Sequence, residues 1–259
     1  MSAPAPAGDC VLREGLREPE LWCVDLEMAA PALAEMEEHT PRLSDWDREN
    51  ASAMTDASAA AQWFATHVAL RLLLERCLGA RWRGVPLQRR PNARPHLADA
   101  PVAFSLSHVP DMGLIALVPE GDVGVDLERA RAVRVRPPRR GAIEAAGAAL
   151  NADSALPGES DARFLQAWVR LEAFAKGQGC GIGRLLTRLG IVGGREIAPA
   201  TRLEAGGAAR AGARAGAVHD LNLGAGLFAA IALAPAQAVP QPRWLPTRLD
   251  GLERMLEGL

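Results

Sequence analysis

The chain has 259 residues, of which 49% are apolar, and it carries 29 Lys and Arg against 31 Asp and Glu. This size permits one large domain or two small ones with a packed core. The near balance of charge gives no overall attraction to nucleic acid or to anionic membranes, and no apolar run approaches the length that spans a bilayer. The four cysteines lack metal-ligand spacing, so we expect reduced thiols in a cytoplasmic protein.

The first half of the chain alternates strand-like and helical patterns. The longest helical pattern has Thr55 as its expected N-cap and Gly79 just past its end. Turn residues at 119–121 separate an N-terminal part, residues 1–120, from a C-terminal part, residues 121–259. In chain order, the patterns up to residue 127 predict a strand at 21–26 and helices at 32–39, 43–53 and 56–78. They then predict three strands, at 102–107, 114–118 and 123–127, which we interpret as a meander.

The second half opens with six arginines and two prolines at residues 129–140. This segment is interpreted either as a solvated basic loop or as a surface for an acidic partner. Binding of nucleic acid is the less favoured interpretation, because no aromatic residues and no helix that could contact bases accompany these arginines. The remaining patterns predict a helix at 143–150 and a second helix that begins near Ser160 or Asp161, runs to residue 176 and is stopped by the glycines at 177–183. They then predict a strand at 185–192, a strand or hairpin arm at 221–233, and a tail with a short helix at 243–259.

Two stretches combine charged residues in a way that suggests chemistry. In the helix that ends at Lys176, the side chains of Trp168, Glu172 and Lys176 recur every four residues and share one stripe. In the strand Val-Gly-Val-Asp-Leu-Glu, the apolar side chains turn to one face and Asp126 and Glu128 turn to the other. Each pattern alone is equally typical of ordinary surface charge. Together they are compatible with a Mg²⁺ ion held by Asp126, Glu128 and Glu172, because Mg²⁺ prefers a few hard oxygen ligands.

These stretches belong to a set of five short motifs whose order and spacing resemble those of the 4′-phosphopantetheinyl transferase superfamily, in its two-lobed, surfactin-synthetase-activating type. The resemblance covers residues 43 to 183. In chain order the motifs are Leu70-Arg71 at a helix end, Ala93-Arg94-Pro95, Phe104-Ser-Leu-Ser-His108, Val123-Gly-Val-Asp-Leu-Glu128, and Trp168-x-x-x-Glu172-Ala-x-x-Lys176.

The resemblance implies an α+β fold of two similar lobes related by a pseudo-twofold axis, each a small, mostly antiparallel sheet packed on a long helix. Coenzyme A would bind between the lobes of a monomer. The implied reaction moves the phosphopantetheine arm of coenzyme A onto a serine of an acyl or peptidyl carrier protein with an acidic surface, and releases adenosine 3′,5′-bisphosphate. Neither nucleic acid nor a membrane is implied as a partner.

The resemblance also implies a role for each matching residue. Asp126, Glu128 and Glu172 would bind Mg²⁺. Glu172 would accept the proton of the serine, and Lys176 would hold the α-phosphate and stabilise the leaving oxygen. The implied contacts to coenzyme A come from Arg48, Arg94, Ser107, His108 and Lys176.

Several positions depart from the pattern of the family. Leu171 stands where a lysine is usual, Ser105 replaces an asparagine, and Asp47 and Asn50 stand where some members have basic residues. These departures suggest weaker binding of coenzyme A, or contacts shifted to Arg42, Arg48 or Arg90. The alternative to an active transferase is a non-catalytic module of the same fold that binds coenzyme A or a carrier protein.

Overall fold

The computed structural model describes residues 15–88, 95–193 and 216–257. It shows an α+β fold with two sheets, as expected. The first sheet has the order β2-β3-β1-β7 and the second has the order β4-β6-β5. Their strands are β1 (Glu20–Asp25), β2 (Ala103–Val109), β3 (Met112–Val118), β4 (Gly124–Arg129), β5 (Ala217–Leu221), β6 (Leu227–Leu233) and β7 (Pro242–Trp244).

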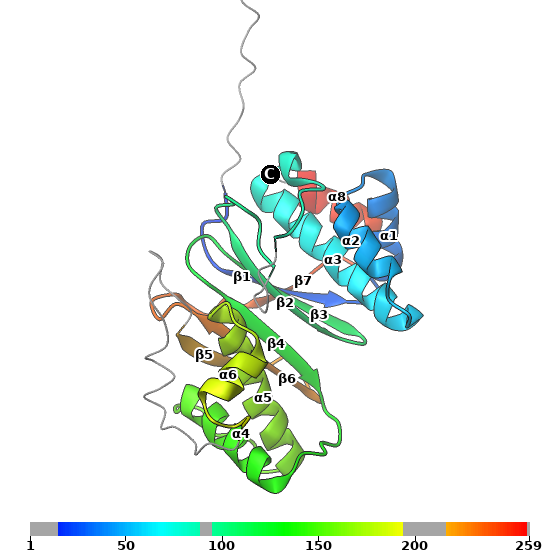
Figure 1. Ribbon diagram of the computed structural model, residues 1–259. Helices are drawn as coiled ribbons and strands as arrows, with labels where there is room; N and C mark the ends of the chain where they lie inside the picture. The colour runs from blue at the N-terminus through cyan, green and yellow to red at the C-terminus, as the bar shows by residue number, and fades with distance from the viewer. Residues whose placement is uncertain (1–14, 89–94, 194–215, 258–259) are drawn as a thin grey trace, which may run out of the picture.

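The helices cover the outer faces of the two sheets (Figure 1). On the first sheet, α3 contacts β2 and also α1, α2 and α8, whereas on the second sheet α5 contacts β4, β5, β6, α4 and α6. The described helices are α1 (Ala30–His39), α2 (Asp45–Ser52), α3 (Ala57–Leu78), α4 (Pro137–Leu150), α5 (Ser160–Gly177), α6 (Ile182–Arg188) and α8 (Leu249–Glu257), with a short 3₁₀ turn at Ala80–Trp82.

Three apolar clusters hold these layers together. The middle cluster joins the facing sides of the two sheets and contains Leu114 of β3, Val125 of β4 and Ile231 of β6. A second cluster joins the first sheet to α1, α3 and α8, and a third joins the second sheet to α4, α5 and α6. The order helices, sheet, sheet, helices buries both faces of each sheet, and burial of apolar surface is the main stabilising term.

Most elements of the first half lie where the sequence places them. The predicted strand at 21–26, the helices at 32–39 and 43–53 and the long helix match β1, α1, α2 and α3. Gly79 ends α3 with a φ of 87°, a backbone conformation that glycine adopts without steric cost. The N-cap prediction was one residue early, because the side chain of Asp56 accepts the hydrogen bond from the Ala59 amide.

The predicted meander is wrong in its third strand. β2 and β3 form an antiparallel hairpin, but β4 pairs with β6, with Asp126 opposite Ala230. The turn at 119–121 is therefore the place where the chain leaves the first sheet. The chain later returns, since β7 pairs with β1 in parallel and α8 contacts α1 and α3. The sequence division at residue 120 assigned these last elements to the C-terminal part, whereas they pack with the first sheet.

Three other predictions need correction in the second half. The predicted strand at 185–192 is wrong, because α6 occupies Ile182–Arg188 and buries Leu185 and Leu186. The arginine-rich segment is not a loop throughout, since α4 begins at Pro137, where proline fits the first helical turn. The N-cap of the long helix α5 is Glu159 and not Ser160 or Asp161. The predicted strand or hairpin arm at 221–233 is confirmed in its second part, where β6 forms a hairpin with β5.

Candidate functional site

A cavity of about 550 Å³ lies where the edge strands β2 and β4 of the two sheets approach each other. It takes its walls from α3, β2 and α5 and from the segment that joins α5 to α6. The lining residues are Trp63, His67, Pro95, Phe104, Ser105, Leu106, Ser107, His108, Glu172, Lys176, Cys180, Gly181 and Ile182.

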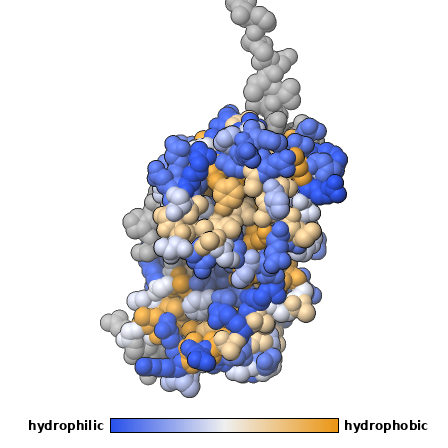
Figure 2. Space-filling model, turned by 90° about the vertical axis from the view of Figure 1, so that its right-hand side faces the viewer, coloured by the Kyte–Doolittle hydropathy of each residue, from blue (hydrophilic) through white to orange (hydrophobic). Residues whose placement is uncertain are grey.

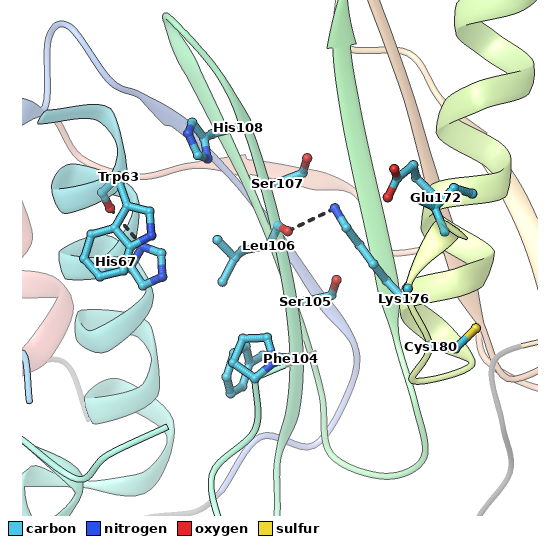
Figure 3. Close-up of a pocket in the computed structure, with 13 residues that line it drawn as sticks. Trp63, His67, Phe104, Ser105, Leu106, Ser107, His108, Glu172, Lys176 and Cys180 are labelled. Atoms are coloured by element: carbon cyan, nitrogen blue, oxygen red, sulfur yellow. Dashed lines mark hydrogen bonds between the residues drawn. The ribbon is translucent and has the colours of Figure 1, made fainter. Parts of the chain in front are cut away.

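Strand β2 divides this cavity into two different sides because successive side chains of a strand point in opposite directions. Figure 3 shows Leu106 directed toward Trp63 and His67 of α3, while Ser105 and Ser107 are directed toward Lys176. The rings of Trp63 and His67 stack with their centroids 3.6 Å apart. One side is therefore mostly apolar and aromatic, and the other carries hydroxyl, carboxyl and ammonium groups.

Lys176 lies at the centre of the polar side. Its ammonium group donates to Asp126 Oδ1 at 2.8 Å, to the Val125 carbonyl at 2.9 Å and to the Leu106 carbonyl at 3.3 Å. The two carbonyls belong to β4 and β2, so the lysine bridges the two sheet edges (Figure 3). Ser107 donates a further hydrogen bond of 2.8 Å to Asp126 Oδ1. Three elements thus meet at one carboxylate.

Glu172 is half-buried one helical turn before Lys176. Desolvation by burial raises its pKa to about 7, and the negative charges of Asp126 and Glu128 add to this increase, while Lys176 opposes it. A carboxyl group with this pKa exchanges its proton near neutral pH, which suits a general acid or base.

Glu128 lies near this cluster on β4, whereas His108, two residues after Leu106, lies on the side of β2 that faces α3 (Figure 3). Glu128 is half-buried and pairs with Arg131 at 3.1 Å. The pKa of His108 is lowered by desolvation and by the positive charge of Lys176, so its imidazole is neutral at pH 7. In that form it offers one hydrogen-bond donor and one acceptor instead of a positive charge.

The structure does not bring every expected residue to the cavity. Arg48 lies on α2 and pairs with Glu37 at 3.1 Å and Asp45 at 3.3 Å, and it is not among the residues that line the cavity. Arg42, suggested as a substitute contact, is buried and donates to Glu75 at 2.7 Å and to backbone carbonyls. Arg94 lies outside the described residues, as does Arg90.

The departures from the family pattern also have structural explanations. Leu171 is fully buried in the cluster that joins α5 to the second sheet, so this position faces the core and not the cavity. Asp47 is fully buried, closes the capping box of α2 with Ser44 and pairs with Arg71. Ser105 accepts a 3.0 Å hydrogen bond from the Val125 amide and so joins β2 to β4.

Sequence reasoning missed the aromatic side of the cavity. Trp63 and His67 are four residues apart in the long helix, a spacing that places them on one face. His67 is buried and lines the cavity. Its spacing from Trp63 was the available signal, although only the fold shows that this face of α3 meets β2.

Asp126, Glu128 and Glu172 all contribute negative charge to this region, but their carboxylates do not form a preorganised metal site. Within residues 15–88, 95–193 and 216–257, no group of three or more His, Cys, Asp or Glu side chains is arranged to hold a metal ion. Asp126 is instead neutralised by Lys176.

Comparison with known proteins adds no assignment, because the sequence matches no protein-family model and a search of curated proteins found no match.

Proposed function

We propose that this protein is a 4′-phosphopantetheinyl transferase, which moves the phosphopantetheine arm of coenzyme A onto a serine of an acyl or peptidyl carrier protein. The observation that carries the proposal is that Ser107, Glu172 and Lys176 line one cavity. Asp126 lies beside it and accepts hydrogen bonds from Ser107 and Lys176, so three elements far apart in the sequence meet there. These residues belong to motifs that resemble those of the superfamily.

The chemistry of transfer needs a base near the serine and positive charge near the leaving group. Glu172, with its pKa near 7, accepts the proton of the serine hydroxyl as the oxygen attacks the β-phosphorus of coenzyme A. The bond from that phosphorus to the bridging oxygen breaks, and adenosine 3′,5′-bisphosphate leaves. Lys176 stabilises the negative charge on the departing oxygen.

The remaining polar groups of the cavity bind and orient the phosphates. Ser107 gives a hydroxyl donor on the Lys176 side of β2, and neutral His108 gives one N–H donor on the opposite side of the strand. Arg94 is proposed for the nucleotide end on the basis of its motif alone. Arg48 would need to leave Glu37 and Asp45 to take part, so we assign it no direct contact in this state.

The residues fit a Mg²⁺ ion in charge and in ligand type. Asp126, Glu128 and Glu172 offer hard oxygen atoms, and the repulsion among them contributes to the raised pKa of Glu172. Mg²⁺ would supply charge neutralisation on the pyrophosphate when bound. For Asp126 to serve as a ligand, the ammonium group of Lys176 has to exchange Asp126 for a phosphate oxygen.

The overall arrangement supports the same proposal. Each sheet is covered on its outer face by one long helix, α3 or α5, which is compatible with two lobes related by a pseudo-twofold axis. We propose that the protein acts as a monomer in the cytoplasm and that its carrier substrate presents an acidic surface. No described helix is both long and apolar enough to cross a membrane.

Intact-mass measurement tests the reaction directly. The purified protein is incubated with an apo carrier protein, coenzyme A and Mg²⁺. We expect the carrier to gain the mass of one phosphopantetheine, and we expect EDTA, Asp126→Ala or Glu172→Gln to prevent the gain. The matched control is Glu159→Gln, an exposed carboxyl at the start of α5. Full activity in Glu172→Gln would remove that residue from the mechanism.

One observation favours a non-catalytic binding module as the second candidate. Lys176 already neutralises Asp126 and bridges the two sheets, which is also what a purely structural lysine would do. The intact-mass measurement separates the transferase from a module that binds coenzyme A without transfer, and calorimetry with coenzyme A separates it from a module that binds carrier proteins alone. The transferase predicts binding that strengthens with Mg²⁺, whereas a module that binds carrier proteins alone predicts no heat of nucleotide binding.

A further inference from the structure

Gly124 lies at the start of β4, directly against the backbone of α5. A Cβ atom at this position would lie 2.0 Å from the Ala173 carbonyl oxygen and 2.4 Å from the Gly177 amide nitrogen. Both distances are far below van der Waals contact, and backbone atoms cannot rotate away. Gly124 is absent from the glycines with positive φ, so the position demands space and not an unusual backbone conformation.

This contact lies between the groups of the proposed site. Along α5, Ala173 follows Glu172 and Gly177 follows Lys176, and along β4 Asp126 is two residues after Gly124. The hydrogen bonds of the Lys176 ammonium to the Val125 carbonyl and to Asp126, 2.9 and 2.8 Å long, cross this same junction. The distance between the helix backbone and the strand backbone therefore fixes the distance between the reacting groups.

We propose that Gly124 is a positioning residue for the site. Because glycine has no Cβ atom, α5 can approach β4 closely enough for Lys176 to bind Asp126 and for Glu172 to lie near both residues. Gly124 itself touches no substrate. The catalytic part of this inference rests on the proposed transferase function, but the geometric part does not.

A second glycine provides a matched control. Gly147 of α4 also packs against α5, and a Cβ atom there would lie 2.6 Å from Ala167. Ala167 is more than one helical turn before Glu172, and Gly147 belongs to a helix that contributes no residue to the cavity. Gly147→Ala therefore overpacks α5 against α4 and not against β4, so it serves as a control for the cost of overpacking α5.

The kinetic test compares the two variants. Because a displacement of about 1 Å can cost about 100-fold in rate, Gly124→Ala is expected to lower kcat about 100-fold. The KM for coenzyme A should rise as well, because the displaced Lys176 is also proposed to bind its phosphates. Gly147→Ala is expected to lower the melting temperature but to keep the kcat of the unmodified protein. Equal losses of kcat in the two variants, or a normal kcat in Gly124→Ala, would overturn the proposal.

A structural readout keeps the test independent of catalysis. The crystal structure of Gly124→Ala is expected to show the Lys176 ammonium beyond hydrogen-bond distance of Asp126, and an intact bond would refute the inference. If this variant does not fold, Ala232→Val is used in its place. Ala232 lies opposite Gly124 on β6 and is buried in the same cluster as Ala173, so its added methyl groups also fill space between the sheet and α5. A protein without any transfer activity would refute the proposed function, yet these structures would still decide the role of Gly124.

Discussion

Glu172 is the residue whose chemistry depends most on its surroundings. An exposed glutamate is ionised at neutral pH, but burial and the charges of Asp126 and Glu128 raise the pKa of Glu172 to about 7. The folded protein therefore holds the proton of this group more tightly than the unfolded chain does. The associated stability is fully present below the unfolded pKa of about 4.5 and is lost as the pH rises through about 7.

Replacing Glu172 by glutamine is expected to remove this part of the pH dependence. Between pH 4.5 and 7.5 the unmodified protein should lose about 1–3 kcal/mol of unfolding free energy that the variant retains. Urea denaturation at both pH values measures the difference. Glu159→Gln, which changes an exposed carboxyl at the same helix, is expected to follow the unmodified protein. Parallel pH profiles for Glu172→Gln and the unmodified protein would show that the pKa is not raised.

At the scale of elements, the junction of β2 with β4 is the unusual feature of this fold. Both are edge strands, and their contact is made by side chains instead of a continuous backbone ladder. Ser105 accepts a hydrogen bond from the Val125 amide, and Lys176 donates to a carbonyl of each strand. Unpaired backbone groups of an edge strand are costly when buried, so these side chains replace the missing ladder.

Ser105→Ala is expected to destabilise this junction. The change leaves the buried Val125 amide without its acceptor, which costs about 1–3 kcal/mol. Because Asp126 is the next residue, transfer activity should fall as well. Urea denaturation and the intact-mass assay measure the two effects. The control is Ser52→Ala, which removes an exposed hydroxyl and its bond to the Glu49 carbonyl. An unchanged stability of Ser105→Ala would contradict the role of this serine.

The elements also show how far the sequence predicts this molecule. The strand alternation around Asp126 and the helical spacing of Glu172 and Lys176 are local patterns, so their faces follow from the sequence. The contacts of Ser105 and Lys176 across β2 and β4 depend on the approach of two sheets, which no local pattern encodes. The error at α6 has a local cause: Leu185, Leu186 and Leu189 have helical spacing, but the preceding glycines were interpreted as a continuing turn.

At the scale of the whole molecule, the end of the chain completes the first sheet. β7 pairs with β1, and α8 places Leu252, which is fully buried, in the cluster that joins the first sheet to α1 and α3. Leu252→Ala is therefore expected to cost about 2–5 kcal/mol of unfolding free energy through the lost apolar contact and the remaining cavity. Chemical denaturation measures this loss. Glu253→Ala, exposed on the same helix, should change stability little, and equal effects of the two variants would show that α8 is not packed.

The surface decides which macromolecule can reach the site. On the face shown in Figure 2, hydrophilic residues gather along the upper edge and apolar residues lie across the middle. Arg131 and Arg140 of the arginine-rich segment form ion pairs with Glu128 and Asp161. Arg134, Arg136 and Arg139 are exposed, so they are the side chains of this segment that would meet the acidic carrier protein of the proposed function.

Replacing Arg134, Arg136 and Arg139 together by glutamate is expected to raise the KM for an acidic carrier about tenfold, because like charges slow the encounter. The KM for coenzyme A should stay the same, since none of these residues lines the cavity. In the unmodified protein, rising salt should raise the KM for the carrier because it screens an attraction. In the variant this dependence should reverse, because salt then screens a repulsion. Glutamates at Arg248 and Arg254, exposed at α8, form the control. Equal effects of the two sets would mean that the net charge of the protein, and not the position of the arginine-rich segment at residues 129–140, governs the encounter.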